Sequence, residues 1–209
     1  MMKRRTTLIS LIMLALAVWM SPLAAAADSS ATDPARNFIE NMAQKAVQAL
    51  TAEGVSRAQR IERFRNLLNE NFDVPVIGRW VLGRYWRAAS DAEKEEYLDL
   101  FEDYVVITYV ERFDQYSGEV IKVTKSVSDP GKDSLVFSEI HRPSGGEPIR
   151  VDWRVRGKSD IYKIIDVYVE GISMSQSQRK EFTSVIRSNG GKVAGLLMVL
   201  RDKIESLSN

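Results

Sequence analysis

The chain has 209 residues, a length that fits a single domain. Its hydrophobic fraction of 44% and charged fraction of 27% are ordinary for a globular protein. The formal net charge is only +1, so the charge balance gives no indication of a nucleic-acid partner. The sequence contains no cysteine, which excludes disulfides, thiolate metal sites and a lipidated cysteine anchor.

The first 27 residues have the pattern of a secretory signal peptide. Three basic residues at positions 3–5 precede an apolar run from Leu8 to Met20, and alanines at 24–27 supply small residues for cleavage. The apolar run is short for a membrane span, although an uncleaved anchor is the alternative. We therefore expect an exported domain over residues 28–209. The absence of disulfides suits a bacterial periplasm.

Two helices should follow the cleavage site. Asp33 and Pro34 form an N-cap and first-turn pair, and Gly54 ends the segment that they begin. Ser56 begins a second helix, with Gln59 three residues later as its capping-box partner. Both segments carry apolar residues at helical spacing, which predicts that each helix buries one face.

The stretch from Asn71 to Ser90 is rich in tryptophan and tyrosine, and its glycines limit any helix to a turn or two. Such a stretch forms either a corner of the core or the lip of an apolar cavity. A long helix should then run from Ser90 to about Tyr116, because Ser90 and Glu93 form a capping box. Residues 104–110 are apolar nearly all round, so this helix should contact the sheet on one side and a helix or a ligand on the other.

The hydrophobic period changes from 3.6 to 2 after Gly118. Short turns separate four predicted strands at 120–127, 134–141, 149–156 and 161–169, which makes an antiparallel meander. Two C-terminal helices follow, one over 177–188 and one carrying apolar residues from Val193 to Ile204. The predicted fold class is α+β, with a curved four-stranded sheet packed on one face by the N- and C-terminal helices.

Catalytic chemistry is sparse in this sequence. His141 is the single histidine, and one histidine without cysteines cannot build a metal cluster. Asp152, Asp166 and Glu170 could pair as acid and base, but strand alternation predicts that they face solvent. Apolar and aromatic residues are plentiful by comparison. A curved sheet capped by helices could enclose an apolar cavity that takes acyl chains, or the helices could close on the sheet and leave no space.

Several segments resemble the MlaC family of periplasmic phospholipid-binding proteins, also called toluene-tolerance auxiliary proteins. They are VLGRYWRAAS at 81–90 and DVYVEGISM at 166–174, together with Phe101–Tyr104, Tyr116–Gly118, Phe182–Gly190 and Leu196–Leu197. The resemblance covers about residues 37–200. It implies an NTF2-like fold that buries the acyl chains of a glycerophospholipid between sheet and helices. It also implies a non-enzymatic carrier that maintains outer-membrane lipid asymmetry.

The implied partners are an inner-membrane ABC transporter complex and an outer-membrane lipoprotein complex, with the carrier acting as a monomer without a cofactor. The candidate lipid-binding residues are chosen by position on the long helix and the sheet: Trp80, Phe101, Tyr104, Val105, Thr108, Tyr109, Val151, Trp153, Val155, Ile165 and Val167. Three alternatives stay open. They are a hopanoid binder of the same family, an NTF2-like enzyme with a small apolar substrate, and a scaffold with a closed core.

Overall fold

The computed structural model describes residues 33–52, 54–110, 116–128, 131 and 133–208. The predicted signal peptide at 1–27 lies outside the described residues. These residues form six α-helices and a 3₁₀ helix: α1 (Pro34–Leu50), α2 (Arg57–Asn71), α3 (Val74–Leu82), η2 (Gly83–Arg87), α4 (Asp91–Val110), α5 (Met174–Ser188) and α6 (Val193–Ser208). They also form five strands: β1 (Val120–Val127), β2 (Ser134–His141), β3 (Ile149–Lys158), β4 (Ile161–Val169) and β5 (Ile172–Ser173).

The predicted helix starts are confirmed at the atoms that cap them. The Asp33 carboxylate accepts the Ala35 amide at 2.9 Å, and Ser56 and Gln59 form a complete capping box. At the start of α4 the Glu93 amide donates to Ser90 Oγ at 3.2 Å, and the Ser90 amide donates to Glu93 at 2.8 Å. These local bonds satisfy amides that would have no partner within the helix.

The sheet is antiparallel throughout and its strands lie in chain order, β1-β2-β3-β4-β5. The α+β class is confirmed, but the prediction of four strands is wrong. Glu170 and Gly171 both have positive φ, 49° and 77°, and they turn the chain back so that Tyr168 pairs with Ser173. Two consecutive residues with positive φ make a tight hairpin turn, and the two residues after it become β5.

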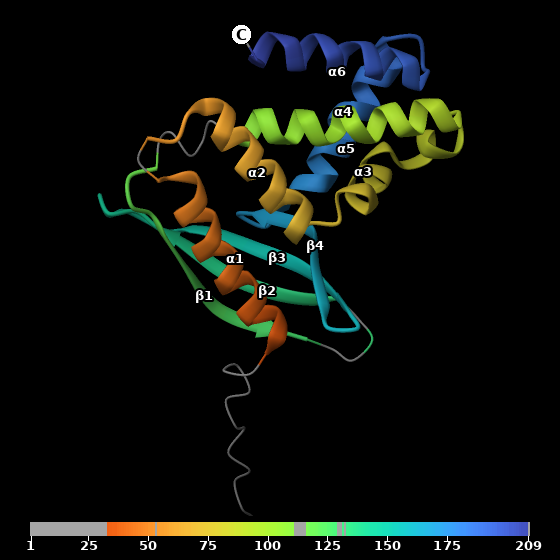
Figure 1. Cartoon of the computed structure of the whole chain (residues 1–209). Coiled ribbons are helices and arrows are strands. Elements are labelled where there is room, and N and C mark those ends of the chain that lie inside the picture. Colours follow the sequence, from red (N-terminus) through yellow and green to blue (C-terminus); the bar gives the residue numbers. More distant parts are fainter. Residues whose placement is uncertain (1–32, 53, 111–115, 129–130, 132, 209) are drawn as a thin grey trace, which may run out of the picture.

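The helices lie in layers above the sheet (Figure 1). Helix α1 packs across β1, β2 and β3, whereas α4 packs chiefly on α6, α2 and α3. The expectation that the long helix would cover the sheet is therefore wrong. The described part of α4 ends at Val110; residues 111–115 of the expected helix lie outside the described residues, and Tyr116 is not helical.

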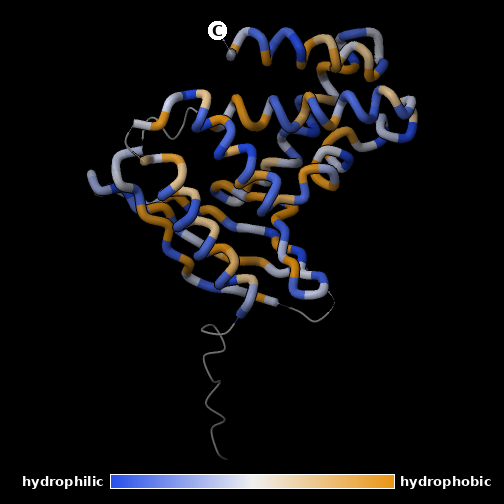
Figure 2. The backbone as a smooth tube through the Cα atoms, in the orientation of Figure 1, coloured by the Kyte–Doolittle hydropathy of each residue, from blue (hydrophilic) through white to orange (hydrophobic). Residues whose placement is uncertain are grey.

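The buried residues form two separate clusters. The helical core joins α2, α3, α4, α5 and α6 around Tyr97, whose hydroxyl donates to the Gly78 carbonyl at 3.0 Å. The sheet core lies between α1 and the strands, around Ile39 and Trp153. Phe72 packs against both clusters, and the Asp73 amide donates to Ile164 on β4 at 3.0 Å. Figure 2 shows hydrophobic and hydrophilic residues alternating along strands and helices, as expected of elements buried on one side.

Candidate functional site on the outer face of the sheet

A groove opens where α3, β3, β4, β5 and α5 meet. Its volume is about 360 Å³, and it is lined by Val76, Trp80, Arg154, Arg156, Ile165, Asp166, Tyr168, Ser173, Ser175 and Gln176. Val76 and Trp80 stand four residues apart on α3 and so lie on one side of that helix. Both remain accessible, at 39% and 45% of their surface. The tryptophan-rich stretch thus serves both predicted purposes: Val74, Val81 and Leu82 are core, and Val76 and Trp80 form the lip of the groove.

A β-bulge brings Ile165 into this groove. Arg154 pairs with Asp166 and Val155 pairs with Ile164, so Ile165 is an extra residue with no partner across the ladder. A bulge interrupts the strict alternation of strand side chains. Ile165 therefore lines the groove, whereas Val167 packs against the sheet core under α1. These two candidate residues therefore lie in different environments.

Asp166 forms the buried polar wall of the groove and is only 9% exposed. Its Oδ2 accepts the Ser173 hydroxyl at 2.6 Å, and its Oδ1 accepts the amides of Val167 at 2.9 Å and of Ser175 at 3.2 Å. Ser173 Oγ in turn accepts the Gln176 amide and caps α5. The expectation that Asp166 faces solvent is wrong, because β5 and the start of α5 fold over it.

The opposite wall carries two arginines held by one carboxylate. Asp133 accepts from Arg154 Nη2 at 2.7 Å and from Arg156 Nε at 2.8 Å. The hydrogen bond from Arg156, joined by that from Arg154, holds the pKa of Asp133 below its ordinary value. These residues continue into a second, more open groove of about 600 Å³ that also reaches Leu135 and Tyr168. The outer face of β2, β3 and β4 is therefore a continuous concave surface that contains both charge and apolar area.

The predicted lipid-binding residues do not gather in one place. Trp80 and Ile165 line the groove. Phe101 is buried in the helical core, Tyr104 and Val105 pack against that core, and Thr108 and Tyr109 are half-buried on the last turn of α4. The remaining four belong to the sheet core: Val151, Trp153, Val155 and Val167. Within that core Trp153 donates to Ser138 at 3.0 Å, and Ser138 donates to the Val151 carbonyl at 2.6 Å.

Several groove residues were absent from the predicted set. Val76 had a usable signal, its spacing of four from Trp80, and the arginines of β3 formed an evident charged face. Ser173, Ser175 and Gln176 had none, because only the turn at Glu170 and Gly171 brings them beside β4.

The other titratable candidates lie away from this groove. His141 pairs with Glu139 at 3.0 Å on β2. Asp152 is buried on the outer face, where burial raises its pKa and Arg150, at 3.5 Å, only partly offsets the effect. Its Oδ1 has no hydrogen-bond partner. Within the described residues, no group of three or more histidine or carboxylate side chains could hold a metal ion.

Comparison with known proteins places the chain in a family. The model of the MlaC protein family matches residues 40–202, which is most of the chain. The chain belongs to the MlaC family. The intermembrane phospholipid transport system binding protein MlaC of Haemophilus influenzae is 24% identical over 130 residues, and the alignment spans 60% of each protein. The chain thus matches less than two thirds of that relative's length.

The fold also matches a solved structure. The phospholipid-binding protein of Ralstonia solanacearum, determined in complex with a phospholipid, superposes with a TM-score of 0.72 and 19% sequence identity. The superposition covers 84% of this chain and 99% of the Ralstonia chain. The MlaC architecture of helices on an open antiparallel sheet is therefore the fold of this protein. None of the helices in the described part of the chain is long and apolar enough to cross a membrane.

Proposed function

We propose that this protein is a periplasmic phospholipid carrier of the MlaC family and not an enzyme. The observation that carries the proposal is the pairing of two environments in one groove. Val76, Trp80 and Ile165 offer apolar surface, and Arg154 and Arg156 stand opposite them. A glycerophospholipid has the same two parts, since acyl chains take apolar surface and a phosphate takes arginine donors.

The proposal assigns the phosphate to the β3 arginines and the first part of the acyl chains to the α3 lip. From there the chains run toward the seam at Phe72, where the helical core meets the sheet core. The buried members of the predicted set then line the chains only when these cores separate. A groove of about 360 Å³ lies within the range of about 300–1,000 Å³ that holds small ligands. Two full acyl chains require the seam to open.

The wider role follows from the family resemblance. We propose that residues 1–27 are removed on export. The mature chain then moves phospholipid between an outer-membrane lipoprotein complex and an inner-membrane ABC transporter, and so maintains outer-membrane lipid asymmetry. The groove offers little to the enzyme alternative. Asp166, the carboxylate among its lining residues, already accepts three hydrogen bonds from its own chain.

The test is to purify the exported protein from the periplasm without detergent. Native mass spectrometry then measures the mass of the protein with any bound lipid, and organic extraction identifies that lipid. We expect a monomer that carries one glycerophospholipid. A hopanoid adduct would move the protein to the hopanoid-associated branch. A bare protein that also refuses added phospholipid would overturn the proposal.

Two tryptophan substitutions locate the cargo. Ile165→Trp fills the groove, so we expect a folded protein without phospholipid. Val151→Trp instead overpacks the closed sheet core, so we expect a protein that is destabilised by about 1–3 kcal/mol. Circular dichroism measures folding and native mass spectrometry measures occupancy. If Ile165→Trp keeps full occupancy, the phospholipid lies elsewhere.

A further inference from the structure

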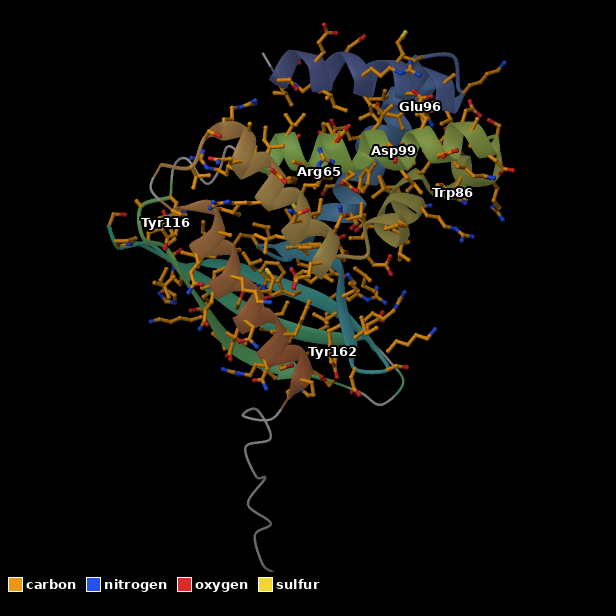
Figure 3. All side chains as sticks on the ribbon, in the orientation of Figure 1. Arg65, Trp86, Glu96, Asp99, Tyr116 and Tyr162 are labelled. Carbon is orange, nitrogen blue, oxygen red and sulfur yellow. The ribbon has the colours of Figure 1, made fainter. Side chains whose placement is uncertain are left out.

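Aromatic rings and arginines alternate along the surface formed by α3, η2 and α5. The guanidinium of Arg84 lies 4.9 Å from the ring centroid of Tyr85, and that of Arg179 lies 5.0 Å from Trp80. The guanidinium of Arg79 lies 5.8 Å from Trp86. Arg84 donates to the Tyr85 hydroxyl at 2.9 Å, and this bond, joined by the nearby Arg187, lowers the pKa of Tyr85. Together with Arg187, these residues form what we call the arginine–aromatic strip. Figure 3 shows Trp86 at the end of the molecule where α3 meets the start of α4.

The strip holds positive charge without carboxylate partners. Several arginines elsewhere bind carboxylates: Arg65 binds Glu102, Arg154 and Arg156 share Asp133, and Arg201 binds Glu96. Among the described residues, no ion pair with a carboxylate engages the arginines of this surface: Arg79, Arg84, Arg87, Arg179 and Arg187. Most of them are exposed, and Arg179 is half-buried over Trp80. The surface therefore attracts anions over a distance of about one Debye length.

The backbone is shaped to keep this arrangement. Gly83 ends α3 with a φ of 60°, which favours glycine. A Cβ on Gly83 would lie 2.7 Å from the guanidinium of Arg179, so a larger residue there would shift Arg179 from its place over Trp80. Helices α3 and α5 pack on one another, and Arg179 of α5, placed over Trp80 of α3, joins the two helices at the surface.

The strip leads directly to the groove. Trp80 belongs to both, and Val76 continues the same side of α3 one turn toward the mouth. Exposed apolar surface therefore adjoins uncompensated positive charge at the point where the cargo would enter. Tryptophan and tyrosine concentrate at membrane–water interfaces, and arginine binds phosphate with its planar fork of donors.

We propose that the arginine–aromatic strip docks the protein on an anionic phospholipid bilayer, with the mouth of the groove turned toward the lipids. The inference rests on the carrier function proposed above, because it gives the cargo a path that avoids water. The arginines match anionic headgroups, and the exposed Trp80 and Val76 beside them match the apolar boundary beneath those headgroups. The bilayer is therefore the partner that fits both parts.

The test is co-sedimentation of the full mature chain with vesicles of phosphatidylcholine alone and of phosphatidylcholine mixed with phosphatidylglycerol. Arg84→Glu/Arg187→Glu reverses two charges in the strip and leaves the groove lining intact. Lys122→Glu/Lys125→Glu makes the same change in net charge on β1, at the far edge of the sheet, where both lysines are exposed. We expect the strip variant to bind the anionic vesicles at least about tenfold more weakly and the β1 variant to bind like the wild type.

The lipid content of each protein separates the two proposals. A strip variant that keeps its phospholipid but no longer sediments with the anionic vesicles supports both the carrier function and the docking. Wild-type protein that holds phospholipid but ignores anionic vesicles overturns the docking and leaves an acidic protein as the partner for these charges. Equal losses in both double variants would also overturn it, because net charge alone would then explain the binding. Wild-type protein that lacks lipid yet binds anionic vesicles through the strip refutes only the carrier.

Discussion

The two faces of the sheet come from the same alternating strands, but one face is buried and the other is accessible. On the inner face, Val136, Val155 and Ile164 are fully buried beneath α1. On the outer face, the same strands present Arg154, Arg156 and Leu135 to a concave surface that none of the described helices covers completely. The inner face is therefore closed core, and the outer face is the one that carries the two grooves.

The difference teaches that apolar character alone does not identify a binding site. The most apolar residues of β3 were natural candidates for the ligand cavity, yet α1 already occupies that space. The groove instead combines a few exposed apolar residues with charged ones, which is typical of a surface kept open for a partner.

The largest loss of stability should come from substitutions on the buried inner face. Trp153→Ala removes a buried indole and its hydrogen bond to Ser138, so we expect a loss of about 3–5 kcal/mol in the free energy of unfolding. Urea denaturation measures it. Leu135→Ala, which changes an exposed residue of the outer face, is the matched control and should cost under about 1 kcal/mol. Similar losses in both variants would mean that the two faces are equally packed.

A smaller loss of stability should come from the buried polar wall of the groove. Asp166→Ala leaves the Ser173 hydroxyl and the Ser175 amide without their acceptor, so we expect a loss of about 1–3 kcal/mol. Ser177→Ala, which removes a more accessible hydroxyl bond in α5, should cost only a few tenths. Thermal unfolding compares the two. If Asp166→Ala is neutral, water replaces the carboxylate and the wall is not preorganised.

The elements that sequence reasoning predicted well depend on neighbours in the chain. The caps at Asp33, Ser56 and Ser90 are set by contacts within four residues, and strand alternation placed Val151, Trp153 and Val155 on one buried face. The signal peptide and the predicted lipid contacts stay predictions.

What sequence reasoning missed depends on contacts between distant segments. The bulge at Ile165 arises from how β4 pairs with β3, and a period of two has no means to detect it. The groove itself exists because α3 and α5 meet beside β4, three elements that lie far apart in the chain. The position of α4 was mistaken for a similar reason. Its apolar sides can be buried against helices as well as against a sheet, and in the structure they pack on α6, α2 and α3.

Within the open face, Asp133 should have a modest and pH-dependent effect. Its pKa is lowered in the folded protein, so its contribution to stability is present above its ordinary value of about 3.9 and disappears as the pH falls through the folded pKa. We expect Asp133→Asn to cost about 1 kcal/mol at neutral pH, less in high salt, because both arginines are half exposed. Once the pH has fallen below the folded pKa of Asp133, the variant and the wild type should converge. Urea titrations across this range measure the difference, and a constant gap would contradict the ion pairs as its cause.

The smallest change in stability should come from Asp152, which lies on the same face but has a raised pKa, whereas that of Asp133 is lowered. Burial raises its pKa, so its contribution is complete below about 3.9 and is lost as the pH rises through the folded value. Asp152→Asn avoids the loss of stability that comes with ionising a buried carboxyl, because an amide carries no charge. At neutral pH we expect the variant to equal the wild type or exceed it by up to about 1 kcal/mol, and below pH of about 4 the two should unfold alike. Arg150 opposes this outcome from 3.5 Å. A variant less stable than the wild type at neutral pH would therefore mean that the ion pair outweighs burial. In that case the outer face would be stabilised by its charges at both aspartates.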